Sequence, residues 1–182
     1  MTGASSDPAP ATARTRPVAS FGKALAWAAG LIVLDAFIFN QGLIALLVGV
    51  CIVVVALPLS FLKKFALVRR QRLRNLGIYF CAVLLVLAAN KLNNRLARER
   101  AELLVSAVKA FQDKHQRYPK VLEDMVPEFI DHVPVAKLTL MQNQFYYRFD
   151  EKYKKAMLSY VALPPFGRPT YLFPENRWWY MD

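Results

Sequence analysis

Apolar residues are concentrated in two long stretches in the first half of the chain. The first stretch runs from Phe21 to Leu62 and is interrupted midway by Asn40-Gln41-Gly42. About 20 helical residues cross the roughly 30 Å of a bilayer, and an Asn-Gln-Gly triplet is typical of a turn. Residues 21–62 therefore predict a hairpin of two transmembrane helices. The second stretch, from Leu76 to Ala89, is uncharged and predicts a third transmembrane helix at 76–90.

The third predicted helix does not stop at the end of its apolar stretch. Gly and Pro are both absent from Ile78 to Tyr118. Apolar residues recur at helical spacing and keep largely to one side: Leu92, Leu96, Leu103, Leu104, Val108 and Phe111. One helix is therefore expected to continue out of the membrane, and Pro119 is expected to end it at Tyr118.

Beyond Pro134 the pattern changes to a period of two. Phe145, Tyr147 and Phe149 alternate with polar or outward positions, and residues 150–152 suit a turn. Residues 156–162, 170–173 and 177–181 predict further strands, while 137–141 suit a short edge strand or a loop. The predicted fold class is an α+β membrane protein whose long third helix packs on a small antiparallel β-sheet.

The net charge of +11 is unevenly distributed. Nine of the 24 Lys and Arg residues lie within residues 1–75, beside the apolar stretches. This distribution favours the orientation signal of an inner-membrane protein over nucleic-acid binding. It places a disordered tail (1–20) and a basic loop (63–75) in the cytoplasm of a bacterium and residues 91–182 in the periplasm.

Few residues suggest chemistry. Asp35 is the only acid within the apolar stretches and is a candidate intramembrane polar site. Its simpler interpretation is a position near the lipid headgroups, one turn from Asn40. Both cysteines, Cys51 and Cys81, lie in apolar stretches, so neither a disulfide framework nor a cysteine metal site is expected. With no catalytic or metal-spaced set, we expect no enzymatic activity and no cofactor.

The layout of residues from the basic segment onward carries a resemblance to a known family. A basic loop, an apolar helix that becomes amphipathic, a Tyr-Pro pair and a run of apolar residues and prolines together resemble type IV pilins, above all the major pseudopilin of type II secretion. The positions that carry it are Tyr118, Pro119, Leu122, Met125, Val126, Pro127, Phe129, Ile130, Val133 and Pro134. The resemblance covers residues 70–182 and implies a pilin-like periplasmic domain at 91–182, with these residues in structural roles.

The chain also departs from that family. Pilins are cleaved after a Gly and carry Glu at the fifth mature position, where it neutralises the amino terminus of a neighbouring subunit. Gly77 is the matching candidate cleavage site, but the fifth residue after it is Ala82. Two additional crossings precede the motif, and the family's calcium loop is not evident. These departures argue against ordinary packing into a fibre.

Together, these observations predict a non-enzymatic inner-membrane protein with a structural or assembly role in a secretion, pilus or other envelope complex. Its expected partners are the lipid bilayer and other envelope proteins, and not nucleic acid. One alternative is a membrane-tethered module that binds a peptide or glycan through Trp178 or Trp179, of which only one can face the core of the sheet. Another is an atypical prepilin cleaved after Gly77.

Overall fold

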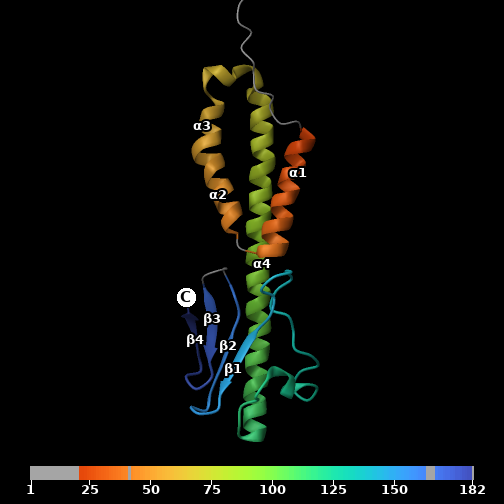
Figure 1. Cartoon of the computed structure of the whole chain (residues 1–182), viewed down its shortest axis with the longest axis vertical. Coiled ribbons are helices and arrows are strands. Elements are labelled where there is room, and N and C mark those ends of the chain that lie inside the picture. Colours follow the sequence, from red (N-terminus) through yellow and green to blue (C-terminus); the bar gives the residue numbers. More distant parts are fainter. Residues whose placement is uncertain (1–20, 41, 163–166, 182) are drawn as a thin grey trace, which may run out of the picture.

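The computed structural model describes residues 21–40, 42–162 and 167–181, so the predicted tail at 1–20 lies outside the described residues. The protein is α+β, as expected. Its axis is α4 (Arg69–His115), a helix of 47 residues. Other helices flank the first half of α4, and a β-sheet covers part of the second half (Figure 1). We refer to the part from residue 91 onward as the head.

Two helical rods flank the first half of α4. The first comprises α1 (Phe21–Ile32) and the π-helix η1 (Val33–Phe39). The second comprises α2 (Leu43–Cys51), the π-helix η2 (Ile52–Ala56) and α3 (Leu57–Ser60). Within the described ranges, three helical stretches are long and apolar enough to cross a membrane: Phe21–Phe39, Leu43–Ser60 and Lys63–His115.

Small side chains mediate the packing of these rods on α4. Ala36 and Ala45 are buried against Val83 and Val86 of α4. Large apolar side chains point outward instead, and Trp27 is 73% exposed. Small residues at the interface allow helix backbones to approach closely, as in helix pairs within lipid.

The boundaries of α4 correct two predictions. The basic segment 63–75 is not a loop, because the 3-10 helix η3 (Lys63–Val68) leads directly into α4 at Arg69. Arg and Gln are good helix formers, and nothing in this segment breaks the helix. At its other end α4 stops at His115, before Tyr118. Gln116 adopts a left-handed conformation (φ 56°), and its N–H donates to the Gln112 carbonyl at 2.7 Å. The αL cap, and not Pro119, ends the helix.

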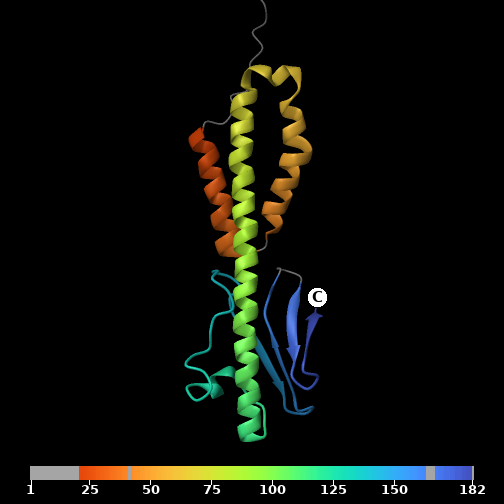
Figure 2. The same ribbon diagram turned by 180° about the vertical axis from the view of Figure 1, so that it is seen from behind.

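Among the described residues, four strands form an antiparallel sheet in the order β1-β2-β3-β4: β1 (Tyr146–Asp150), β2 (Lys155–Ser159), β3 (Arg168–Leu172) and β4 (Arg177–Met181). Residues 137–141 form a loop and no strand. One cross-strand row, Tyr147, Leu158, Tyr171 and Trp178, faces α4 and joins the core of the head. The segment between α4 and β1 lies on the other side of α4 from β3 and β4 (Figure 2).

Candidate functional site

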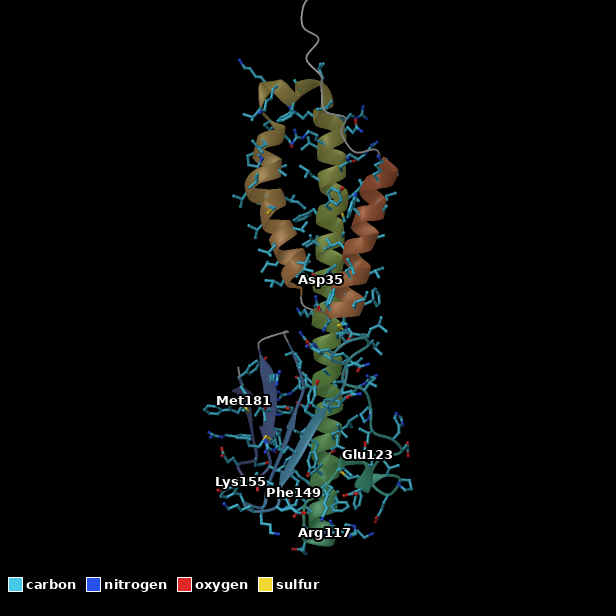
Figure 3. The ribbon with its side chains drawn as sticks, in the orientation of Figure 1. Asp35, Arg117, Glu123, Phe149, Lys155 and Met181 are labelled. Atoms are coloured by element: carbon cyan, nitrogen blue, oxygen red, sulfur yellow. The ribbon has the colours of Figure 1, made fainter. Side chains whose placement is uncertain are left out.

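Asp35 lies at the end of the helical rods that is nearest to the head (Figure 3). Its carboxylate is fully buried and accepts hydrogen bonds from the backbone N–H groups of Gly42 (2.7 Å) and Ala45 (2.8 Å). Gly42 is the N-cap residue of α2 and has no side chain to cap the helix. Asp35 supplies the missing cap from the preceding rod. The carboxylate is therefore held inside the hairpin as the cap of α2, and the position of Asp35 near the lipid headgroups stays a prediction.

A layer of asparagines lies at the same level on α4. Asn40 is 2% exposed, and its Oδ1 accepts from Asn93 Nδ2 at 3.4 Å. Asn90 packs on Gly42, where a Cβ would come within 3.0 Å of Asn90 Nδ2 and where φ is +66°. Neither side-chain polar atom of Asn90 has a hydrogen-bond partner in the described part of the chain. The sequence carries a signal for this layer, because three of the five positions from Asn90 to Asn94 are asparagines.

The head is hydrogen-bonded to this layer through the loop at 138–141. The N–H of Leu140 donates to the Phe37 carbonyl at 2.9 Å, and that of Met141 donates to the Ile38 carbonyl at 3.3 Å. Asn93 Oδ1 accepts from the N–H of Leu138 at 3.2 Å. The last carbonyls of a helix have no partner within the helix. The loop donates hydrogen bonds to two of these carbonyls at the end of η1, so the first rod and the head are directly joined.

The first residues of the pilin-like motif, from Tyr118 onward, lie at the end of the head that is farthest from the helical rods. Leu122 and Met125, in the 3-10 helix η4 (Leu122–Met125), are buried in the core, and Pro119 is also fully buried. The Tyr147 hydroxyl donates to the Pro119 carbonyl at 2.8 Å. The ring of Tyr118 lies 5.8 Å from that of Phe173. The structure thus places these motif residues between the end of α4 and the sheet.

The remaining motif positions follow η4 along the same side of α4. Val126 is half-exposed, and the Val126–Pro127 peptide bond is cis. Val133 packs against the core of the head, and Pro134 lines a cavity of about 600 Å³ beside α4.

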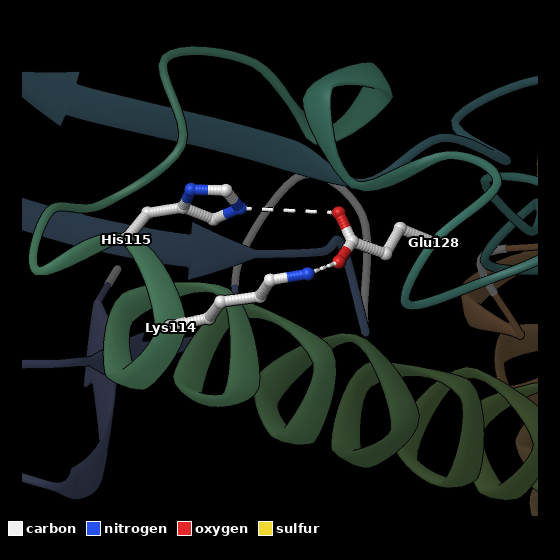
Figure 4. A network of polar contacts seen from close by, with 3 residues as sticks. All are labelled: Lys114, His115 and Glu128. Carbon is white, nitrogen blue, oxygen red and sulfur yellow. Dashed lines mark hydrogen bonds and ion pairs between the residues drawn. The ribbon is translucent and has the colours of Figure 1, made fainter.

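A polar network joins the end of α4 to this segment (Figure 4). Lys114 donates to one carboxylate oxygen of Glu128, and His115 Nε2 lies 3.9 Å from the other. The bond from Lys114 holds the pKa of the Glu128 carboxyl below its usual value. These groups are well exposed, and His115 also stacks on Phe111 with ring centroids 4.4 Å apart. His115 and Glu128 also line a cavity of about 560 Å³, and the pairing of Glu128 with Lys114 positions the loop at one wall of that cavity.

A cavity of about 740 Å³ lies at the tip of the head farthest from the helical rods. Arg117, Lys120 and Lys154 contribute positive charge to it, and Tyr118 and Phe149 contribute aromatic rings. Lys120 is already paired with Glu151, with Nζ 3.0 Å from Oε1. The cavity combines mixed charge with aromatic surface, which suits a peptide or glycan contact better than bond-making chemistry. Among the described residues, no three His, Cys, Asp or Glu side chains form a group that could hold a metal ion.

The two tryptophans differ as alternation along β4 requires. Trp178 is partly buried and packs against the core of the head, with Arg98 4.0 Å from the centre of its ring. Trp179 points to the other side of the sheet and is 50% exposed. Trp179 is therefore the candidate contact residue.

Gly77 is exposed within the continuous helix α4. Cleavage after Gly77 stays a prediction.

Lys137 is a buried cation that the sequence did not single out. It is 1% exposed, and its Nζ donates to the Ala162 carbonyl at 3.0 Å. Burial lowers the pKa of Lys137 from 10.5 to about 8. A single lysine between aliphatic residues such as Ala136 and Leu138 shows no pattern that predicts such burial.

The stability of the head is expected to rise with pH between about pH 8 and 10, because unfolded Lys137 binds a proton that the folded protein has lost. Unfolding free energies measured at about pH 7.5 and 9.5 should differ by about 1–2 kcal/mol, since the slope is at most about 1.4 kcal/mol per pH unit. Lys137→Met should remove the slope, whereas Lys152→Met at an exposed position should keep it. A slope that persists in Lys137→Met would assign it to another group.

Comparison with protein-family models, with curated proteins and with solved structures finds no match.

Proposed function

We propose that this chain is a non-enzymatic protein of the bacterial inner membrane, with three crossings and a pseudopilin-like periplasmic head. Its role is structural or assembly-related, in a secretion, pilus or other envelope complex. The observation that carries the proposal is α4, a single helix whose first half packs between two apolar rods and whose second half carries a four-stranded antiparallel sheet in the described chain. A long helix that bears a sheet on its outer half is the layout that the pilin resemblance implies.

The distribution of side chains on the helical rods supports the membrane assignment. Large apolar residues such as Trp27, Leu47 and Val54 face outward, while alanines mediate the internal contacts. In water this arrangement would leave an extensive apolar surface exposed, which soluble monomers avoid. Lipid removes that penalty, since acyl chains are as apolar as leucine. The basic residues around Arg69 to Arg74 then mark the cytoplasmic end.

The surroundings of Ala82 support a role without fibre formation. Ala82 occupies the position where pilins carry their glutamate, and it is 3% exposed. Together with Ala28 and Ile32 of the first rod it lines an apolar cavity of about 560 Å³. The first rod thus occupies a side of the helix that a pilin would offer to its neighbours. A carboxylate here would be costly without a partner.

Intact-mass measurement of the membrane-extracted protein tests the proposal. The expected mass is that of the whole chain, 20.7 kDa. A chain that begins at Ile78 would instead support the atypical prepilin. Reporter fusions after Asn75 and Asp182 should give a cytoplasmic and a periplasmic signal, respectively. A cytoplasmic signal at Asp182 would contradict the proposed orientation.

A second candidate function is supported by the outer side of the sheet. Trp179 is half-exposed there, and it lies in the same cross-strand row as Thr170, Ser159 and the half-exposed Tyr146. An aromatic surface of this kind suits a membrane-tethered module that binds a peptide or a glycan.

The two tryptophans are expected to respond oppositely to alanine substitution. Trp178→Ala should lower the unfolding free energy by about 2 kcal/mol, because it removes apolar area from the core of the head. Trp179→Ala should change it by less than about 0.5 kcal/mol but should weaken retention of the protein on peptidoglycan or peptide beads. Retention that is equal for the parent and Trp179→Ala would remove the support for the binding module.

A further inference from the structure

The loop at 138–141 exposes its apolar side chains and buries its polar one. Leu138 is 62% exposed, Leu140 is 77% exposed and Met141 is 51% exposed. Thr139 is buried instead, and its hydroxyl donates to the Met141 carbonyl at 2.9 Å. A surface loop in water usually has the reverse arrangement. The orientation is built into the loop, because the threonine bond fixes the turn that directs both leucines outward.

Hydrogen bonds fix the level of this loop relative to the helical rods. The backbone N–H groups of Leu140 and Met141 donate to the Phe37 and Ile38 carbonyls at the end of η1, and the N–H of Leu138 donates to Asn93 of α4. The loop therefore reaches the end of the first rod from the head side, as both views of the fold show (Figure 1). Phe37 itself is 54% exposed, so the apolar surface of the loop continues that of the rod.

The adjoining turn of α4 adds residues suited to the same environment. Leu92 is 67% exposed beside Asn93. Lys91 is also exposed. The side chain of Arg95 is 79% exposed and pairs with Glu99 on the same helix, with Nε 2.9 Å from Oε1. Apolar side chains flanked by Lys and Arg at one level are typical of the boundary between acyl chains and anionic headgroups, where long cationic side chains reach phosphate.

We propose that residues 138–141 dock into the outer-leaflet headgroup–acyl boundary of the bilayer that the helices cross. This inference rests on the proposed function, since it requires the rods to lie in the membrane. The occupant is lipid because the loop is continuous with the lipid-facing end of η1 and is held at that level by backbone bonds. Leu138, Leu140 and Met141 thus act as a second anchor, which holds the head against the membrane surface.

Depth-dependent fluorescence quenching of the full chain tests the docking. Cys51→Ala and Cys81→Ala provide a background without cysteine, in which Leu140→Cys carries a nitrobenzoxadiazole label. The protein is reconstituted in phosphatidylethanolamine–phosphatidylglycerol vesicles that contain nitroxide lipids, labelled either near the headgroup or at mid-chain. Leu47→Cys, in α2, is the control within the membrane, and Tyr153→Cys, in the exposed β1–β2 turn, is the control in water.

We expect the label at position 140 to be quenched more strongly by the nitroxide near the headgroup than by that at mid-chain. The label at position 47 should show the reverse order, and that at 153 should not be quenched. Leu138→Cys should repeat the result for Leu140→Cys, with circular dichroism confirming parental helix content for each variant.

The quenching results distinguish a failure of the docking proposal from a failure of the proposed membrane protein. If position 47 is quenched and positions 138 and 140 are not, the docking is overturned while the membrane helices stand. A blue-shifted label at 140 without lipid quenching would identify contact with another copy of the chain and would also overturn the docking. If position 47 is not quenched, the proposed membrane protein itself fails.

Discussion

Asp35→Ala is expected to destabilise the helical hairpin by about 2–4 kcal/mol, because hydrogen bonds to a charged group contribute about 1.5–3 kcal/mol each and unpaired buried donors are costly. The substitution leaves the Gly42 and Ala45 N–H groups without the carboxylate that now binds them at 2.7 and 2.8 Å. Neither lipid nor the neighbouring apolar side chains can replace it. Thermal unfolding in detergent, followed by circular dichroism, measures the loss.

Hydrogen exchange separates this effect from a general loss of structure. Peptides that cover Gly42 to Ala45 should exchange faster in Asp35→Ala, while peptides from the sheet should keep their parental rates. Asp35→Asn retains one acceptor oxygen and should lie between the parent and Asp35→Ala. Asp131→Ala, at an exposed position in the head, is the matched control. Unchanged exchange at Gly42 and Ala45 in Asp35→Ala would show that the carboxylate does not cap α2.

Leu104→Ala is expected to lower the free energy of unfolding of the head by about 2–5 kcal/mol, the range measured for buried leucines replaced by alanine. Leu104 is fully buried in the core between α4 and the sheet, so truncation removes apolar contacts and leaves a cavity. Denaturant unfolding of the detergent-solubilised full chain, followed by tryptophan fluorescence, reports on the head through Trp178.

The preceding residue offers a control on the same helix. Leu103 is 63% exposed, so Leu103→Ala should change stability by less than about 0.5 kcal/mol. The two substitutions remove the same atoms and leave the same helix-forming residue in place. Equal losses in both variants would mean that α4 does not direct Leu104 into the core of the head.

Local sequence patterns are sufficient to predict the long helix and the strands. The absence of Gly and Pro from Ile78 to Tyr118 predicted one long helix, and the alternation of Phe145, Tyr147 and Phe149 predicted a strand. Both patterns reflect short-range geometry, which a sequence records directly. The same reasoning predicted that one of Trp178 and Trp179 faces the core, which the structure assigns to Trp178.

The contacts that local sequence patterns do not reveal join residues that are distant along the chain. Asp35 binds an amide ten residues away, and Lys137 donates to a carbonyl 25 residues away, so neither contact has a periodic signature. The loop at 138–141 meets Phe37 and Ile38 only because α4 brings the head to the end of η1. The early end of α4 depends on the left-handed conformation of Gln116, for which the adjacent Tyr-Pro pair was a misleading signal.

The continuity of α4 has a mechanical consequence. A helix of 47 residues at about 1.5 Å per residue is about 70 Å long, and it crosses the boundary between rods and head without a break. Rotation of the head about this axis must therefore turn Arg69 and Arg70 at the opposite end. The hydrogen bonds from Leu140 and Met141 also attach the head to η1, so a force on the head is transmitted to both α4 and η1. In the orientation proposed above, a force applied to the head would reach the other end of α4, at Arg69, as a rotation of α4 relative to η1.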